Sequence, residues 1–112
     1  MSGGAPAPMV VRLGDARQIP PGEGRAFDVA GEQVAIFRLR NGSLRAVSAV
    51  CPHKGGPIAD GQIDNGVVLC PLHLNAFSLD TGCSTSFATP LRTYRVSVDA
   101  DHGLVVHLPA LT

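Results

Sequence analysis

Residues 51–73 read CPHKGGPIADGQIDNGVVLCPLH, and this stretch decides how the rest of the chain is interpreted. It contains Cys51 and His53, separated by one residue, and Cys70 and His73, separated by two. Thiolate and imidazole are side chains that bind zinc and iron well. The residues between the two pairs leave room for a hairpin to depart and return, so both pairs can converge on one point. The sequence therefore predicts a metal site built from these four side chains.

Zinc and iron are both compatible with this donor set, whereas accidental clustering of two such pairs is improbable. A structural zinc site takes two cysteines and two histidines in the same way. The one-residue gap between Cys51 and His53 is shorter than the gaps usual within zinc-ligand pairs, which disfavours zinc on spacing. Gly55 and Gly56 would allow the backbone to approach a metal centre closely. A zinc-stabilised interaction module remains the alternative of another functional class.

Outward from this stretch, the chain is typical of short strands joined by turns. Segments 33–40 and 44–50 are strand candidates, and the Asn-Gly pair at 41–42 predicts a tight hairpin turn between them. Residues 92–98 and 104–108 predict a final hairpin. No stretch shows a convincing 3.6-residue apolar period. Together with 13 glycines, 9 prolines and an aromatic content of 4%, this pattern predicts an all-β fold.

One strand candidate departs from strict alternation. Within segment 33–40, the apolar residues Val34, Ile36 and Leu39 cannot all lie on one face of a regular strand. The segment therefore predicts either a β-bulge or a strand that is buried on both faces.

Length, charge and cysteine content limit the possible functions. The 112 residues suit one domain, which we expect at 9–110 after a disordered tail at 1–8. Nine basic and nine acidic residues give no formal net charge, which argues against binding to nucleic acid or to a membrane surface. An odd number of cysteines, no signal-peptide pattern and no apolar stretch of membrane-spanning length predict a cytoplasmic protein.

The run CPHKGGPIADG followed by CPLH resembles the signature of Rieske [2Fe–2S] proteins, Cys-x-His … Cys-x-x-His. The resemblance extends from about Val10 to Leu108. It implies an incomplete antiparallel barrel or sandwich with an inserted cluster-binding subdomain at about residues 46–84. It also implies one [2Fe–2S] cluster, with one iron held by the two cysteines and the other by the two histidines. Thr89 and Pro90 would then lie where a proline-containing loop helps to cover the cluster.

Several positions depart from the high-potential members of that family. Such proteins carry an extra cysteine in each loop, where this chain has Gly56 and Leu72, so the resemblance implies no bridge between the loops. Asn75 and Phe77 stand where those proteins place Ser and Tyr hydroxyls. Without hydroxyl donors to sulfur, the reduction potential should fall at the low, ferredoxin-like end of the Rieske range. Cys83 has no predicted partner and is expected to be a small buried hydrophobe or an inert thiol.

The expected function is one-electron transfer between larger proteins. The sequence has no nucleotide fingerprint and no mononuclear iron triad, so we do not expect the chain to be catalytic alone. The metal motif and segment 31–38 (GEQVAIFR) resemble the small subunit of NAD(P)H-dependent nitrite reductase, the interpretation that we favour. The ferredoxin component of a Rieske oxygenase system is the alternative. The implied redox partners are a flavin reductase, a nitrite reductase large subunit or an oxygenase. His102 and His107 are expected to be exposed to solvent and not to be ligands.

Overall fold

The computed structural model describes residues 8–49, 58–64, 66–69, 76–83 and 91–111. Nine strands and two single-turn 3-10 helices follow one another along these residues. In chain order they are β1 (Met9–Asp15), η1 (Ala16–Gln18), β2 (Gly24–Val29), β3 (Glu32–Arg38), β4 (Leu44–Ser48), η2 (Ile58–Asp60), β5 (Gln62–Asp64), β6 (Val67–Leu69), β7 (Ala76–Ser78), β8 (Thr93–Val98) and β9 (Gly103–Leu108).

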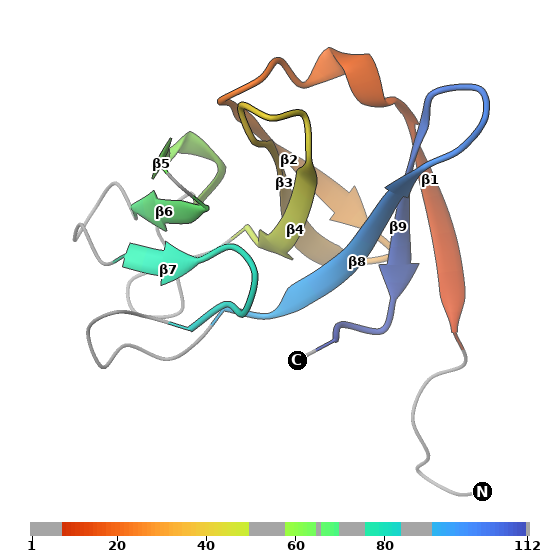
Figure 1. Cartoon of the computed structure of the whole chain (residues 1–112). Helices are drawn as coiled ribbons and strands as arrows, with labels where there is room; N and C mark the ends of the chain where they lie inside the picture. Colours follow the sequence, from red (N-terminus) through yellow and green to blue (C-terminus); the bar gives the residue numbers. More distant parts are fainter. Residues whose placement is uncertain (1–7, 50–57, 65, 70–75, 84–90, 112) are drawn as a thin grey trace, which may run out of the picture.

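The strands form two antiparallel sheets. Six of them build a large sheet in the order β1-β9-β8-β4-β3-β2, and three build a small sheet in the order β5-β6-β7. The large sheet curls into an open half-barrel, and the small sheet lies beside it (Figure 1). In sequence the small sheet lies between β4 and β8, so the chain leaves the large sheet, builds the small one and returns. The predicted all-β, incomplete-barrel fold is therefore confirmed.

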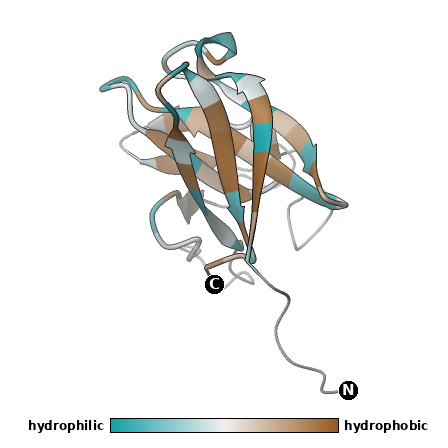
Figure 2. Cartoon of the chain, turned by 90° about the vertical axis from the view of Figure 1, so that its right-hand side faces the viewer, coloured by the Kyte–Doolittle hydropathy of each residue, from teal (hydrophilic) through white to brown (hydrophobic). Residues whose placement is uncertain are grey.

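Strand β3 is buried on both faces, which explains its departure from strict alternation. Val34 and Ile36 contact the apolar cluster inside the half-barrel, whereas Ala35 and Phe37 contact a second cluster on the other face. The register between β3 and β4 is unbroken, so no bulge is needed. The strands of the large sheet are mostly apolar along their middle, while hydrophilic residues gather toward their ends and turns (Figure 2).

The two clusters divide the core between the interior of the half-barrel and the space between the sheets. We call the first the barrel cluster; its buried members are Ala16, Ile19, Val29, Val34, Ile36, Ala46, Tyr94, Leu104, Val106 and Leu108. We call the second the inter-sheet cluster; its buried members are Ala35, Phe37, Val47, Ala49, Ile58, Val68, Phe77, Leu79 and Leu91. Fully burying each large apolar side chain contributes roughly 1.5–3 kcal/mol to stability before conformational entropy is subtracted.

The predicted hairpin turn at 41–42 is confirmed and joins β3 to β4. Gly42 has a φ of 92°, which an L side chain rarely adopts. The side-chain oxygen of Asn41 accepts a 2.9 Å hydrogen bond from the N–H of Ser43. The turn therefore follows from local chemistry, as expected for this residue pair.

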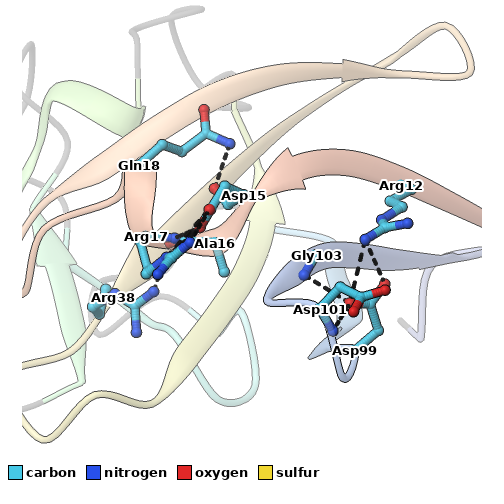
Figure 3. A network of polar contacts seen from close by, with 9 residues as sticks. All are labelled: Arg12, Asp15, Ala16, Arg17, Gln18, Arg38, Asp99, Asp101 and Gly103. Atoms are coloured by element: carbon cyan, nitrogen blue, oxygen red, sulfur yellow. Dashed lines mark hydrogen bonds and ion pairs between the residues drawn. The ribbon is translucent and has the colours of Figure 1, made fainter.

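A polar network fixes the turns at the end of the half-barrel remote from the small sheet (Figures 1 and 3). The guanidinium of Arg12 lies over Gly103, where a Cβ would leave no room for it, and its Nη2 is 3.1 Å from Asp99 Oδ2. Arg17 Nη2 lies 2.7 Å from Asp15 Oδ2, and its hydrogen bonds hold the pKa of Asp15 well below the ordinary value.

No helix in the described part of the chain is long and apolar enough to cross a membrane.

Candidate functional site

The two Cys–His pairs lie in segments 50–57 and 70–75, outside the described residues, so the site is defined by the residues that flank them. The first segment leaves and rejoins the fold at one hydrogen bond, which Ile58 N–H donates to the carbonyl oxygen of Ala49 at 2.8 Å. The N–H of Ala49 donates in turn to the carbonyl oxygen of Gln33 in β3, at 2.9 Å. The two ends of the first segment are therefore held together and anchored on the large sheet.

The second segment connects β6 to β7. Leu69 pairs with Ala76 at the end of this antiparallel ladder, and Val68 pairs with Phe77 one step further in. Because neighbouring side chains along a strand point to opposite faces, Val68 and Phe77 share the face that is fully buried. The segment that contains Cys70 thus begins and ends at two directly paired residues.

Gly61, which follows η2, brings the two flanking regions into contact. Its N–H donates a 2.9 Å hydrogen bond to the carbonyl oxygen of Ile58. A Cβ at this position would overlap with the carbonyl oxygen of Leu69 and lie 3.1 Å from that of Ile58. The backbone that follows the first segment is therefore packed against the residue that precedes Cys70. Only glycine permits this approach without a shift of the backbone.

A third segment, residues 84–90, lies between Cys83 and Leu91 of the described chain. Leu91 N–H donates a 2.8 Å hydrogen bond to the carbonyl oxygen of Gly82, so this segment also begins and ends close together. The next residue, Arg92, accepts a 2.9 Å hydrogen bond at its carbonyl oxygen from Ser48 N–H, at the end of β4. Thr89 and Pro90, for which the resemblance implies a role in covering the cluster, fall inside the third segment and outside the described residues.

The inter-sheet cluster lies beneath the ends of all three segments. Ala49 and Ile58 flank the first segment, Phe77 follows the second by one residue, and Leu91 directly follows the third. None of these four side chains is more than 6% exposed. Buried side chains of this kind pack as closely as those of other protein interiors. The cluster therefore anchors the three segments on one common base.

The family model of the Rieske [2Fe-2S] domain matches residues 9–95. The chain belongs to the Rieske [2Fe–2S] domain family. The cofactor of this Rieske domain is one [2Fe–2S] cluster, which decides between iron and zinc. The residues present fit such a cluster, because two cysteines and two histidines are the mixed ligand set of a Rieske centre. The contact of Gly61 with Leu69 places the described backbone after the first segment beside the described residue before the second.

The similar proteins differ in how much of their own length this chain covers. The chain is 38% identical over 73 residues to cholesterol 7-desaturase nvd 1 of Ciona intestinalis, a match covering 64% of this chain and 16% of the desaturase. A solved Mycobacterium tuberculosis chain, named as the small subunit of an NADH-dependent nitrite reductase, has a TM-score of 0.85 and 27% identity, covering 95% of this chain and 100% of that one. The ferredoxin of carbazole 1,9a-dioxygenase from Nocardioides aromaticivorans IC177 has a TM-score of 0.80 and 33% identity, covering 87% and 95%. The chain thus spans only a small part of the desaturase but nearly all of the two smaller proteins.

A polar group borders the first and third segments. Tyr94 hydroxyl donates a 2.7 Å hydrogen bond to Glu32 Oε1, and Arg92 Nη1 lies 3.9 Å from the same oxygen. Burial of the phenol, followed by its hydrogen bond to Glu32, raises the pKa of Tyr94 to about 12. The hydroxyl is therefore protonated at any physiological pH and acts as a donor.

Three predictions concern cysteine and histidine residues that lie within the described ranges. Cys83 is exposed, so the first of its two expected roles, a buried hydrophobe, is wrong, while the second, an inert thiol, stays a prediction. It follows a turn in which its own N–H donates to Thr81 Oγ1 at 3.2 Å, and this turn places it at the surface. His102 is exposed, as predicted, whereas His107 is half-buried with Nε2 at 3.1 Å from Ser97 Oγ. In the described ranges, no three His, Cys, Asp or Glu residues form a group that could hold a metal.

Sequence reasoning missed the close approach of Gly61 to Leu69 and the hydrogen bond between Glu32 and Tyr94. Gly61 reads as an ordinary turn residue in a glycine-rich stretch, and its contact with Leu69 arises only when the small sheet forms. Glu32 and Tyr94 are far apart in sequence, and no local pattern pairs them. The one available signal was that Tyr94 is the single tyrosine of a chain poor in aromatic residues.

Proposed function

We propose that Cys51, His53, Cys70 and His73 hold the [2Fe–2S] cluster and that the chain is a one-electron carrier between larger redox proteins. The observation that supports this proposal is the contact of Gly61 with Leu69, because it packs the backbone soon after the first proposed ligand segment against the residue that precedes the second. A bound cluster of this type accepts and releases one electron at a time. The protein itself would hold the four donors above the buried apolar side chains of the inter-sheet cluster.

The favoured assignment is the small subunit or ferredoxin component of a nitrite-reductase-like oxidoreductase. It is supported by the likeness to the M. tuberculosis chain, which extends over 95% of this chain and all of that one. A large nitrite reductase subunit would then be the acceptor. The alternative is the ferredoxin component of a Rieske oxygenase system, supported by the higher identity, 33%, to the carbazole 1,9a-dioxygenase ferredoxin.

Two further assignments accompany this proposal. We place the cluster-binding subdomain at about residues 46–84 within a domain that spans 9–110. A cytoplasmic location suits a chain with three cysteines in which Cys83 is an exposed free thiol.

Electron paramagnetic resonance of the anaerobically purified, dithionite-reduced protein tests the ligand set. We expect a rhombic signal with the low average g of a histidine-ligated [2Fe–2S] centre. Cys51→Ser and Cys70→Ser should lose the cluster, whereas Cys83→Ser serves as the matched control and should keep the signal unchanged. A signal of the all-thiolate type that disappears in Cys83→Ser would show that Cys83 replaces a histidine ligand.

The partner assignment needs a separate experiment. The reduced chain is mixed in a stopped-flow instrument with a sirohaem nitrite reductase large subunit or with the terminal component of a Rieske oxygenase. We expect the nitrite reductase subunit to reoxidise the cluster at the higher second-order rate. Faster reoxidation by the oxygenase would replace the favoured assignment with the alternative.

A further inference from the structure

In the described residues, the shortest ladder of the large sheet is the β4–β8 seam, formed by Ala46–Ser48 and Arg92–Tyr94. Its ladder pairs Ala46 with Tyr94 and Val47 with Thr93, whereas the neighbouring β3–β4 ladder pairs five residues of each strand. One further hydrogen bond, from Ser48 N–H to Arg92 O, extends it. A short ladder opens more easily than a long one, because fewer hydrogen bonds must break together.

Glu32 and Tyr94 strengthen this seam from the side. Strand β4 lies between β3 and β8, so the 2.7 Å hydrogen bond from Tyr94 Oη to Glu32 Oε1 crosses β4 and joins the strands on either side of it. Tyr94 is only 6% exposed, and its ring packs in the barrel cluster. A hydrogen bond from a buried phenol to a carboxylate is stronger than one between two neutral groups.

The seam also fixes the spacing between two segment ends. Ala49, where the first ligand segment begins, directly follows Ser48 at the end of β4, and Leu91, where residues 84–90 end, directly precedes Arg92. The backbone of Arg92 is bound to Ser48 twice, through its carbonyl oxygen at 2.9 Å and through its N–H to Ser48 Oγ at 3.1 Å. Separation of β4 from β8 would therefore move Ala49 and Leu91 apart.

We propose that Glu32 and Tyr94 are positioning residues whose hydrogen bond keeps the β4–β8 seam closed and so prolongs the retention of the cluster. Glu32 lies on neither ligand segment, and it acts through the backbone of Ser48 and Arg92. The link to the cluster rests on the proposed ligand set, whereas the effect on the seam does not.

Amide hydrogen exchange and cluster loss to an iron chelator test this proposal in the intact holoprotein. Tyr94→Phe removes only the hydroxyl, and Glu32→Ala removes the acceptor. Each should accelerate exchange at Ser48 and Arg92 by about tenfold, the expected effect of losing one charged hydrogen bond at a local opening. Each should also release iron several-fold faster. Glu32→Gln keeps a neutral acceptor oxygen and should restore part of the protection that Glu32→Ala loses.

Ser97→Ala is the matched control, because Ser97 lies on β8 like Tyr94 but away from the seam, and its hydroxyl contacts His107 of β9. It should change neither readout. Equal acceleration by Ser97→Ala, or unchanged exchange in Tyr94→Phe and Glu32→Ala, would overturn the proposal. Faster exchange with unchanged iron release would overturn the link to cluster retention. If the unaltered protein holds its cluster on other ligands, the proposed ligand set fails, while the exchange result still judges the seam.

Discussion

Arg45 Nε lies 2.6 Å from Asp80 Oδ1, and this ion pair joins β4 of the large sheet to the turn that follows β7 of the small one. The side chains are 34% and 65% exposed, so water screens most of their attraction. The turn is also held internally, because Ser78 Oγ accepts hydrogen bonds from the N–H groups of Asp80 and Thr81 at 3.2 and 3.3 Å. The pair therefore adds to a contact that the inter-sheet cluster already makes.

Arg45→Gln should lower the free energy of unfolding only slightly, by about 0.5 kcal/mol. Urea denaturation of Arg45→Gln, Asp80→Asn and the double variant gives the coupling free energy. Raising the salt concentration should reduce this coupling, since exposed charges are screened. Arg25→Gln with Glu23→Gln provides the control cycle, because that pair is also exposed and joins β2 only to the turn before it. A coupling above about 2 kcal/mol would contradict the screened description.

Gly61→Ala should damage the site more than its small size suggests. The added methyl group would meet the carbonyl oxygen of Leu69 and the side chain of Val68, so the backbone must shift. We expect a loss of about 2 kcal/mol in the free energy of unfolding, as for overpacking of a close contact, and a lower iron content per chain. The measurements are urea denaturation and iron analysis of the purified protein.

Gly42→Asn is the control for that substitution. Nothing lies within 4 Å of a Cβ at Gly42, and Asn tolerates its positive φ better than other residues do. This variant should keep its iron and lose little stability. Full iron content in Gly61→Ala would show that the contact between Gly61 and Leu69 does not set the geometry of the site.

The all-β class and the hairpin at 41–42 could be predicted because turn chemistry and alternation are local properties. The burial of β3 on both faces was one of two predicted outcomes, and the four consecutive apolar residues Val34–Phe37 are consistent with it. Residues 51–66 show almost no periodicity in sequence, yet the described part of this stretch contains η2 and β5. Strand β5 is the three-residue segment Gln-Ile-Asp, which has little strand preference of its own and exists because β6 pairs with it.

Contacts between distant parts of the chain could not be predicted. The pairing of β1 with β9 and the bond between Glu32 and Tyr94 depend on how the sheet curls. The exposure of Cys83 was missed because a free cysteine is buried in most proteins. Here Cys83 follows the turn at Thr81, whose side-chain oxygen accepts its N–H. The four proposed ligands were found from spacing alone, and they stay a prediction that spectroscopy must test.

Phe77→Tyr should raise the reduction potential of the cluster. Phe77 is fully buried on β7, directly after Ala76, the first ladder position that follows residues 70–75. A hydroxyl donated to a cluster sulfur or thiolate favours the reduced, more negative state. One such hydrogen bond is worth about 1 kcal/mol, or about 40 mV for a one-electron couple. Protein-film voltammetry measures the change.

A second phenylalanine-to-tyrosine substitution, remote from the inter-sheet cluster, tests whether the change in reduction potential is specific to position 77. Phe27 lies on β2 and packs against the barrel cluster, away from the inter-sheet cluster. Phe27→Tyr should therefore leave the potential unchanged. A folded Phe77→Tyr protein with an unaltered potential would show that the ring at this position does not face the cluster.

Ionisation of the Tyr94 phenol should make the folded protein less stable above pH 10. Burial and the hydrogen bond to Glu32 raise its pKa to about 12 in the folded state, whereas a tyrosine in the unfolded chain titrates near 10. The folded state holds the phenol proton more tightly, so its stabilisation is complete below pH 10 and is lost as the pH rises to 12. The loss should reach about 2–3 kcal/mol. Because Tyr94 is the single tyrosine, tyrosinate absorbance reports its pKa directly, and urea denaturation across this range should show a decline that Tyr94→Phe lacks. A tyrosinate transition centred near pH 10 in the folded protein would contradict the burial and the bond to Glu32 together.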